Sequence, residues 1–137
     1  MLFRTSMCRA FFTLFAMCHF NVTQTLNLLY SSVIDAYAKC GDPISAERIL
    51  IKMRKEGIQP DSRIYNTLIQ AWAYSQEPRK ARKAKLILLD LKNTVGTSSN
   101  SNISILAACN SILQACALTS DPREKAEAME IAREIFS

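Results

Sequence analysis

The sequence Tyr30-Ser-Ser-Val-Ile-Asp-Ala-Tyr-Ala38 decides the fold, because it recurs twice, with changes, in this chain of 137 residues. It returns 35 residues later as Tyr65-Asn-Thr-Leu-Ile-Gln-Ala-Trp-Ala73, and 44 residues after that as Cys109-Asn-Ser-Ile-Leu-Gln-Ala-Cys-Ala117. Three prolines recur with the same two spacings, at Pro43, Pro78 and Pro122. Because the nine-residue segment and the prolines recur with the same spacings, they indicate an internal repeat.

Each unit has the pattern of two helices. In the first half of a unit, apolar residues recur at intervals of three, four and seven, as Leu29, Val33 and Tyr37 do in the first unit. In the second half, Ala, Ile, Leu and Met recur in the same way, and this is the period of one helical face. The expected helices are 28–40, 43–56, 62–75, 78–93, 105–119 and 122–136, with an exposed loop over 94–104 that lacks apolar periodicity.

Local signals mark several helix ends. Asp42 before Pro43 and Asp121 before Pro122 place a capping acceptor at the N-cap and a proline at the first helical position. Glu124 follows Asp121 by three residues, as in a capping box. Gly57 follows a basic last turn and can adopt the left-handed C-terminal cap.

Composition and stacking together predict an all-α fold. The chain is 49% hydrophobic and has only three glycines and four prolines, which excludes a disordered tail and a loop-rich scaffold. One helical hairpin cannot bury both of its apolar faces, whereas stacked hairpins share a continuous core. We therefore expect an α-solenoid of helix-turn-helix repeats, divided into 27–61, 62–105 and a truncated 106–137, after a separate segment 1–26.

Charge is unevenly distributed along these units. The net charge is +5 overall, and by segment it is +2 for 1–26, zero for 27–61, +5 for 62–105 and −2 for 106–137. The local excess comes largely from one basic cluster: Arg79, Lys80, Arg82, Lys83 and Lys85. Such a cluster is either a solvated helix face or a surface for a polyanion such as nucleic acid.

The first unit resembles the pentatricopeptide repeat family. It has 35 residues, Tyr30 at its fourth position, an Ala-aromatic-Ala-Lys run that ends at Lys39, and a closing Gly57-Ile-Gln-Pro-Asp61. The second unit matches in its first helix and has nine extra residues, and the third has Cys109 in place of the aromatic residue. The Trp and Leu-Gly signature of tetratricopeptide repeats is not found. The resemblance implies a right-handed α-α superhelix.

The resemblance also implies single-stranded RNA binding, with one base for each unit. It implies that the fifth and last residues of a unit read the base edge; these are Ser31, Asp61, Asn66 and Asn110, with Ile105 as a weak last residue of the second unit. It implies that the second residue packs against the base planes, which gives Leu28, Arg63 and Ala107. Lys39 is at the position of a phosphate-contacting lysine. Helix capping is the alternative role for the Ser, Asn and Asp residues.

Residues 1–26 allow three interpretations. Residues 1–34 contain two arginines and no acidic residue, which suits an organellar transit peptide, and the family is mostly mitochondrial or plastid. We expect one of these organelles, with the mitochondrion slightly preferred. Leu14 and Met17 copy the spacing of Leu50 and Met53, so that the segment is alternatively a remnant of an earlier helix. A secretory signal is the third interpretation.

No catalytic constellation is evident. His19 is the only histidine, the five cysteines form no CxxC pair, and no glycine-rich phosphate loop is present. We therefore expect no enzyme activity, no cofactor, no metal, no small-molecule substrate, no disulfide and no membrane span. Two functions remain: an RNA-binding module for organellar RNA processing, stability or translation, and a helical scaffold for protein partners without RNA binding.

Binding by three repeats alone is expected to be weak. Stacking contributes roughly 1–3 kcal/mol per base, so that three bases correspond to millimolar or at best micromolar affinity before ordering costs. The chain is therefore expected to work beside further repeats, another protein or a second copy of itself.

Overall fold

The computed structural model describes residues 2–94 and 99–137 and is all-α over these ranges. Six helices occur there: α1 (Leu2–Lys39), α2 (Pro43–Lys55), α3 (Ser62–Tyr74), α4 (Lys80–Thr94), α5 (Ser99–Ala117) and α6 (Pro122–Phe136). The described residues contain no strand. The expected α-solenoid of helical hairpins is confirmed, because the helices pair in chain order as α1/α2, α3/α4 and α5/α6.

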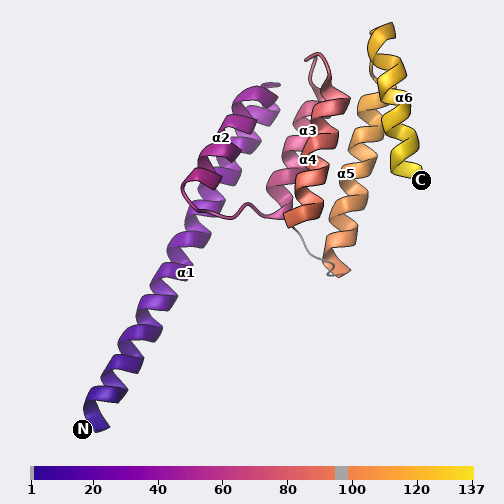
Figure 1. Cartoon of the computed structure of the whole chain (residues 1–137). Helices are drawn as coiled ribbons and strands as arrows, with labels where there is room; N and C mark the ends of the chain where they lie inside the picture. Colours follow the sequence, from indigo (N-terminus) through magenta and orange to yellow (C-terminus); the bar gives the residue numbers. More distant parts are fainter. Residues whose placement is uncertain (1, 95–98) are drawn as a thin grey trace.

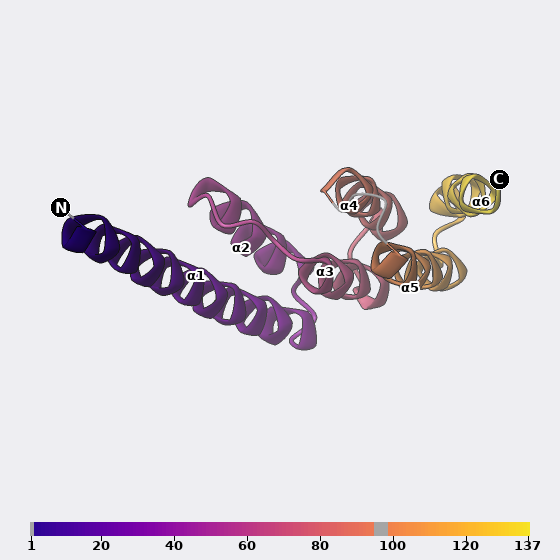
Figure 2. The ribbon, with the colours of Figure 1, turned by 90° about the horizontal axis from the view of Figure 1, so that it is seen from below.

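The hairpins stack side by side and form two layers. Figure 2 shows α1, α3 and α5 in one layer and α2, α4 and α6 in the other. Helix α3 packs against both α1 and α5, while α4 packs against α3, α5 and α6. The first helices α1, α3 and α5 therefore form one layer, and most of the predicted base-contacting residues belong to these three helices.

Helix α1 is much longer than expected. The sequence predicts a helix over 28–40, whereas the structure continues it back to Leu2 without a break. In Figure 1 the N-terminal half of α1 projects away from the stacked hairpins. Segment 1–26 is therefore no separately packed element in its described part, although its proposed role as a transit segment stays a prediction.

The predicted caps of the short helices are present. Asp42 accepts a hydrogen bond from the Ser45 backbone N–H at 3.0 Å, and Asp121 accepts one from the Arg123 N–H at 2.9 Å. Gly57 has φ +75°, and the Ile58 N–H donates to the Met53 carbonyl at 3.1 Å, as expected for a left-handed C-terminal cap. Local sequence signals thus define both ends of α2.

Two helices begin at other residues than expected. Helix α4 begins at Lys80 rather than residue 78, because Arg79 has φ +59° and its backbone N–H donates to Glu124 Oε1 at 2.9 Å. This contact uses the Glu124 carboxylate, which the capping-box pattern assigns instead to the N-terminus of α6. Helix α5 begins at Ser99, so that the predicted loop over 94–104 is wrong for its last six residues; residues 95–98 lie outside the described part.

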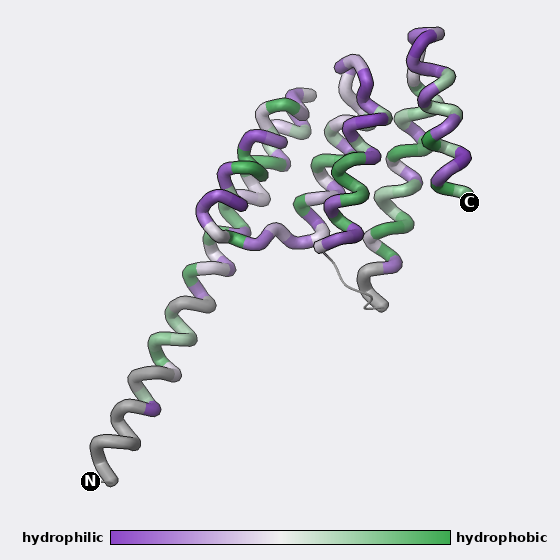
Figure 3. Tube along the Cα trace, in the orientation of Figure 1, coloured by the Kyte–Doolittle hydropathy of each residue, from purple (hydrophilic) through white to green (hydrophobic). Residues whose placement is uncertain are grey.

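The core is centred on α3. Seven of its residues are buried because other helices contact it on several sides: Ile64, Tyr65, Leu68, Ile69, Ala71, Trp72 and Ala73. The buried Tyr65 hydroxyl accepts a hydrogen bond from Arg54 of the preceding unit at 2.5 Å. Hydrophobic residues recur along every helix, as Figure 3 shows. Apolar packing between units is therefore the main stabilising interaction.

One predicted apolar face is exposed. Leu29, Val33 and Tyr37 of α1 have exposed fractions of 59%, 41% and 38%. The residues at the equivalent positions of the second unit are buried against the first: Ile64, Leu68 and Trp72. The periodicity of Leu29, Val33 and Tyr37 correctly indicates a helix, but their burial would also require a neighbouring hairpin on that side of α1.

Candidate nucleic-acid interface

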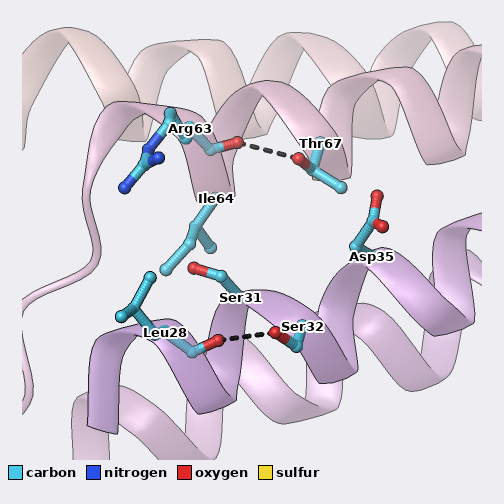
Figure 4. Close-up of a pocket in the computed structure, with 7 residues that line it drawn as sticks. All are labelled: Leu28, Ser31, Ser32, Asp35, Arg63, Ile64 and Thr67. Carbon is cyan, nitrogen blue, oxygen red and sulfur yellow. Dashed lines mark hydrogen bonds between the residues drawn. The ribbon is translucent and has the colours of Figure 1, made fainter. Parts of the chain in front are cut away.

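A groove lies between α1 and α3 on the surface of the first helices. It consists of two adjoining hollows of ≈ 270 and ≈ 280 Å³ that share Leu28, Ser31 and Arg63. The second hollow also includes Asp61. Leu28, Ser31 and Asp61, which the resemblance assigns to the first unit, therefore meet Arg63, which it assigns to the second unit, in one groove. Figure 4 shows the Leu28 and Ser31 side chains directed toward the space between the two helices.

Ser31 presents an acceptor to this groove. It lies within α1, half-buried, and its hydroxyl donates to the Asn27 carbonyl at 2.9 Å. The bond uses the only hydroxyl proton and leaves lone pairs on Oγ. Because Ser31 is far from the start of α1, helix capping does not explain this residue.

Asp61 has two structural roles at the groove. Its Oδ1 accepts the Ile64 backbone N–H at 3.1 Å and so forms the N-cap of α3, as the capping alternative predicts. Its Oδ2 accepts from both Nε and Nη2 of Arg63 at 3.3 Å. Since the Arg63 side chain is mostly exposed, this ion pair is weak and can be exchanged for contacts with a ligand.

Leu28 and Arg63 form opposite sides of the groove. Leu28 is an exposed apolar side chain on α1, and Arg63 extends from the first turn of α3 (Figure 4). An aliphatic side chain and a planar guanidinium are both suitable surfaces for the face of a nucleobase. Ala107, the counterpart in the third unit, is exposed on α5.

Asn66 and Asn110 lie at equivalent positions on α3 and α5. Asn66 is half-buried, and its Oδ1 is buried without a hydrogen-bond partner. Asn110 is exposed. Neither residue lines the two hollows between α1 and α3. Ile105 lies inside α5 and is partly buried against the core, so it is not placed like Asp61 in a turn before the next helix.

Lys39 is already paired within α1. Its Nζ lies 2.7 Å from Asp35 Oδ2, one helical turn away. The hydrogen bond from Lys39 to Asp35 and the charge of that carboxylate raise the pKa of Lys39 above its usual value. Asp35 also lines the groove, so that this end of the groove is less positive than Lys39 alone implies.

The basic cluster on and before α4 binds to other parts of the chain. Lys83 pairs with Glu47 of α2, while Arg82 and Lys85 pair with Glu127 and Glu134 of α6. Lys80 is buried, and its Nζ lies 3.4 Å from the carbonyl oxygens of Ser75 and Leu118. These cations link neighbouring units and contribute less to an external electrostatic field than their number suggests.

Sequence reasoning missed several groove residues. The hollows are also lined by polar and apolar neighbours: Gln24, Asn27, Ser32, Asp35, Ile64 and Thr67. Asn27 and Asp35 are four residues before and after Ser31, and residues at this spacing share a helical face. The periodicity around Ser31 could therefore have identified them.

The described residues contain no group of three or more metal-ligating side chains. None of the helices in the same part of the chain is long and apolar enough to cross a membrane. Stacked helical hairpins with a groove between the first two first helices, α1 and α3, define the class: an α-helical repeat protein.

Comparisons with known proteins show which type of repeat the chain resembles. The PPR repeat family model matches residues 28–74, which include Leu28, Ser31, Asp61 and Arg63 of the α1–α3 groove. A chloroplastic pentatricopeptide repeat-containing protein of Arabidopsis thaliana is 46% identical over 50 residues, or 36% of this chain and 4% of the relative. A second pentatricopeptide repeat-containing protein of that plant is 27% identical over 89 residues, or 64% of this chain and 16% of the relative.

The chain is thus similar to pentatricopeptide repeat proteins over residues 28–74, where the family model matches, and over the segments aligned with the two named relatives. It spans only 4% and 16% of the length of these two relatives. No solved structure matches it significantly.

Proposed function

We propose that the chain is a single-stranded RNA-binding module that holds one base between α1 and α3. The observation that carries the proposal is the meeting of Leu28, Ser31, Asp61 and Arg63 in one groove. Two of these residues offer hydrogen-bond acceptors, and the other two offer surfaces for stacking. Single-stranded RNA is usually recognised through this combination of edge and face contacts.

The resemblance to the family implies a purine, and guanine in particular, for the pair Ser31 and Asp61, and the groove chemistry is compatible with that base. Ser31 keeps acceptor lone pairs while it donates to Asn27, and the Asp61 carboxylate is an acceptor only. The Watson–Crick edge of guanine carries adjacent N–H donors that such a pair of acceptors can receive. We propose that Asn66 and Asn110 contact pyrimidines in the next two units. The exposed Asn110 can both donate and accept, whereas the buried Oδ1 of Asn66 leaves only its amide N–H groups for such a contact.

Organellar RNA processing, stability or translation is the proposed setting. One relative is named as chloroplastic, which supports an organellar location and does not favour the mitochondrion. The role proposed for the chain is binding, without catalysis.

The test compares two substitutions that alter equivalent N-caps. Asp61→Asn keeps an effective N-cap on α3 but replaces one acceptor oxygen with a donor amide. Asp121→Asn makes the same change at α6, away from the groove. Binding of short fluorescent RNAs that contain one guanine, or inosine in its place, is measured by anisotropy at low salt.

We expect Asp61→Asn to reduce the guanine preference about tenfold or more, because hydrogen bonds to charged groups contribute roughly 1.5–3 kcal/mol. Asp121→Asn should leave it unchanged. Equal effects of both substitutions, or no binding to any RNA pool, would contradict the proposal.

The scaffold function makes a different prediction for the other units. If the same surface holds a peptide, Asn66→Ala and Asn110→Ala should not affect any base preference. If the surface reads RNA, these substitutions change the preferred base at the corresponding positions of the oligonucleotide. The base preference of the two variants therefore distinguishes the two classes of function.

A further inference from the structure

A continuous apolar stripe runs along α1 on the side away from α3. Its residues follow one another at intervals of four, four, three, four, four and three: Cys18, Val22, Leu26, Leu29, Val33, Tyr37 and Cys40. Cys40 continues the last turn, since its N–H donates to the Ala36 carbonyl at 3.0 Å. This spacing repeats every eleven residues and keeps the stripe on one face of a nearly straight helix.

The stripe is separate from the proposed RNA groove. Leu29 and Val33 are each two residues from Ser31, which places them about 160° around the helix from the groove. All stripe residues except the partly buried Leu26 are exposed, including Val22 at 55%. A protein bound to the stripe would therefore leave the groove open.

The stripe has the character of an interface between helices. Its central residues correspond to Ile64, Leu68 and Trp72, which are buried in the contact between the first and second units. Exposed apolar side chains arranged in a continuous row typically indicate a site of protein association.

The length of the stripe indicates its partner. It covers 23 residues, or about 35 Å of helix. Helices α2 and α3 have 13 residues each and would cover little more than half of it. Among the described helices only α1, with 38 residues, is long enough to cover the whole stripe.

The stripe is also complementary to itself when one copy is reversed. An antiparallel arrangement centred on Leu29 brings Leu29 opposite Leu29 of a second copy. It also brings Leu26 opposite Val33, Val22 opposite Tyr37, and Cys18 opposite Cys40, with the heights of each pair matching to within about one residue. Every apolar layer of one helix thus meets an apolar layer of the other.

Charge favours this antiparallel order. A parallel pair in register would bring Arg9 beside Arg9 and Lys39 beside Lys39 of the two copies. The antiparallel pair separates these like charges and aligns the two helix dipoles favourably. No acidic residue occurs in α1 before Asp35, so neither order gains opposite-charge pairs along the stripe.

We propose that two copies of this chain associate through an antiparallel pairing of their α1 stripes about a two-fold axis at Leu29. The interface is isologous, because each copy uses the same face. The dimer presents two α1–α3 grooves, one from each copy. Two linked weak sites bind one RNA strand more tightly than either site alone when the strand spans both.

The first test is the mass in solution. Sedimentation velocity over a range of concentrations should show the full chain at twice its monomer mass of 15.4 kDa. Leu29→Lys should shift the midpoint of dimer formation at least tenfold to higher concentration. Leu106→Lys is the matched control, since Leu106 is 69% exposed on α5 and lies outside the stripe. It should leave dimer formation unchanged.

A chain that stays monomeric at all concentrations would overturn the proposal. So would a dimer that responds equally to Leu29→Lys and Leu106→Lys, or an open polymer formed by end-to-end stacking of the hairpins. Circular dichroism establishes that each variant keeps its helical content.

The second test determines the orientation by cross-linking. In a Cys8→Ser background, Cys18→Ser and Cys40→Ser are prepared separately and treated with a short bismaleimide. Burial raises the pKa of Cys116, which slows its reaction relative to exposed cysteines. Mass spectrometry identifies the joined residues.

An antiparallel dimer gives little cross-linking in either variant alone and a Cys18–Cys40 product when the two variants are mixed. A parallel dimer gives the opposite result, with products in each separate variant and none that joins Cys18 to Cys40. The second outcome would overturn the proposed pairing.

Discussion

The Asp42 carboxylate controls the beginning of α2 through two contacts with one residue. Its Oδ2 accepts from the Ser45 hydroxyl at 2.6 Å, and its Oδ1 accepts from the Ser45 backbone N–H at 3.0 Å. These hydrogen bonds, the hydroxyl contact first, lower the pKa of Asp42 below its usual value. Because the charged form is favoured in the folded state, the contacts stabilise the fold when Asp42 is ionised.

This shift predicts a contribution of Asp42 to acid sensitivity. A depressed pKa in the folded state stabilises the protein above the unfolded value of about 3.9, and the benefit is lost as pH falls through the folded value. Asp42→Asn keeps a capping oxygen but cannot titrate. As the pH falls below about 4, we expect the urea unfolding midpoint to fall less steeply for the variant than for the unsubstituted chain. Unfolding of the variant should also take up fewer protons, by at most about one. Identical acid profiles would contradict this assignment.

At the scale of helices, α3 should dominate stability. Leu68 is fully buried between units, so we expect Leu68→Ala to reduce the free energy of unfolding by about 2–5 kcal/mol. Leu106→Ala removes the same atoms from an exposed position on α5 and should change it by less than about 0.5 kcal/mol. Denaturant titration monitored by circular dichroism measures both. Similar losses for the two variants would show that α3 is not the centre of the core.

Helix α4 should contribute to unit packing more than to RNA binding. Arg82 and Lys85 are paired with acidic residues of α6. We expect Arg82→Ala to change RNA affinity less than twofold and stability by about 0–1 kcal/mol, as for other exposed ion pairs. Arg63→Ala, in the groove, should weaken RNA binding and lower its salt dependence. Anisotropy titrations at several salt concentrations test both, and a larger loss for Arg82→Ala would identify α4 as a phosphate-binding surface.

Elements that depend on nearby residues were predicted correctly from the sequence. Asp42 with Pro43 and Gly57 define α2 because caps and prolines act within one turn. The start of α4 was missed because it depends on Glu124, which is 45 residues away from Arg79. The exposure of Leu29 was missed because periodicity identifies an apolar face without showing whether a neighbour covers it.

The candidate site was predictable only in part, because the repeat pattern gives the positions of residues but not the contacts between their side chains. Repeat phase predicts Ser31 and Asp61 from a single unit, and Asp61 is adjacent to Ser31 in space because the second unit begins there. The pairing of Asp61 with Arg63 and of Lys39 with Asp35 depends on side-chain rotamers, which a repeat pattern does not specify.

The whole molecule is a nearly one-dimensional stack, so its stability should vary along the chain. Helix α3 has packed neighbours on several sides, and the N-terminal half of α1 projects from the array. Among the described helices, α6 packs only against α4 and α5. In such arrays, local unfolding begins at the ends and spreads toward the centre. An unsupported helix in water is only marginally stable, because nucleation is costly and each added residue contributes little.

Hydrogen exchange should reveal this gradient and its dependence on association. In dilute solution we expect backbone amides of α3 to exchange slower by several orders of magnitude than those of residues 2–17, with α6 between them. Residues 18–33 should become more protected as concentration rises, because a second copy covers the stripe, while residues 2–17 stay fast. Exchange measured by mass spectrometry at two concentrations separates the effects: protection of 18–33 that does not change with concentration would mean that this part of α1 is stabilised within a single copy.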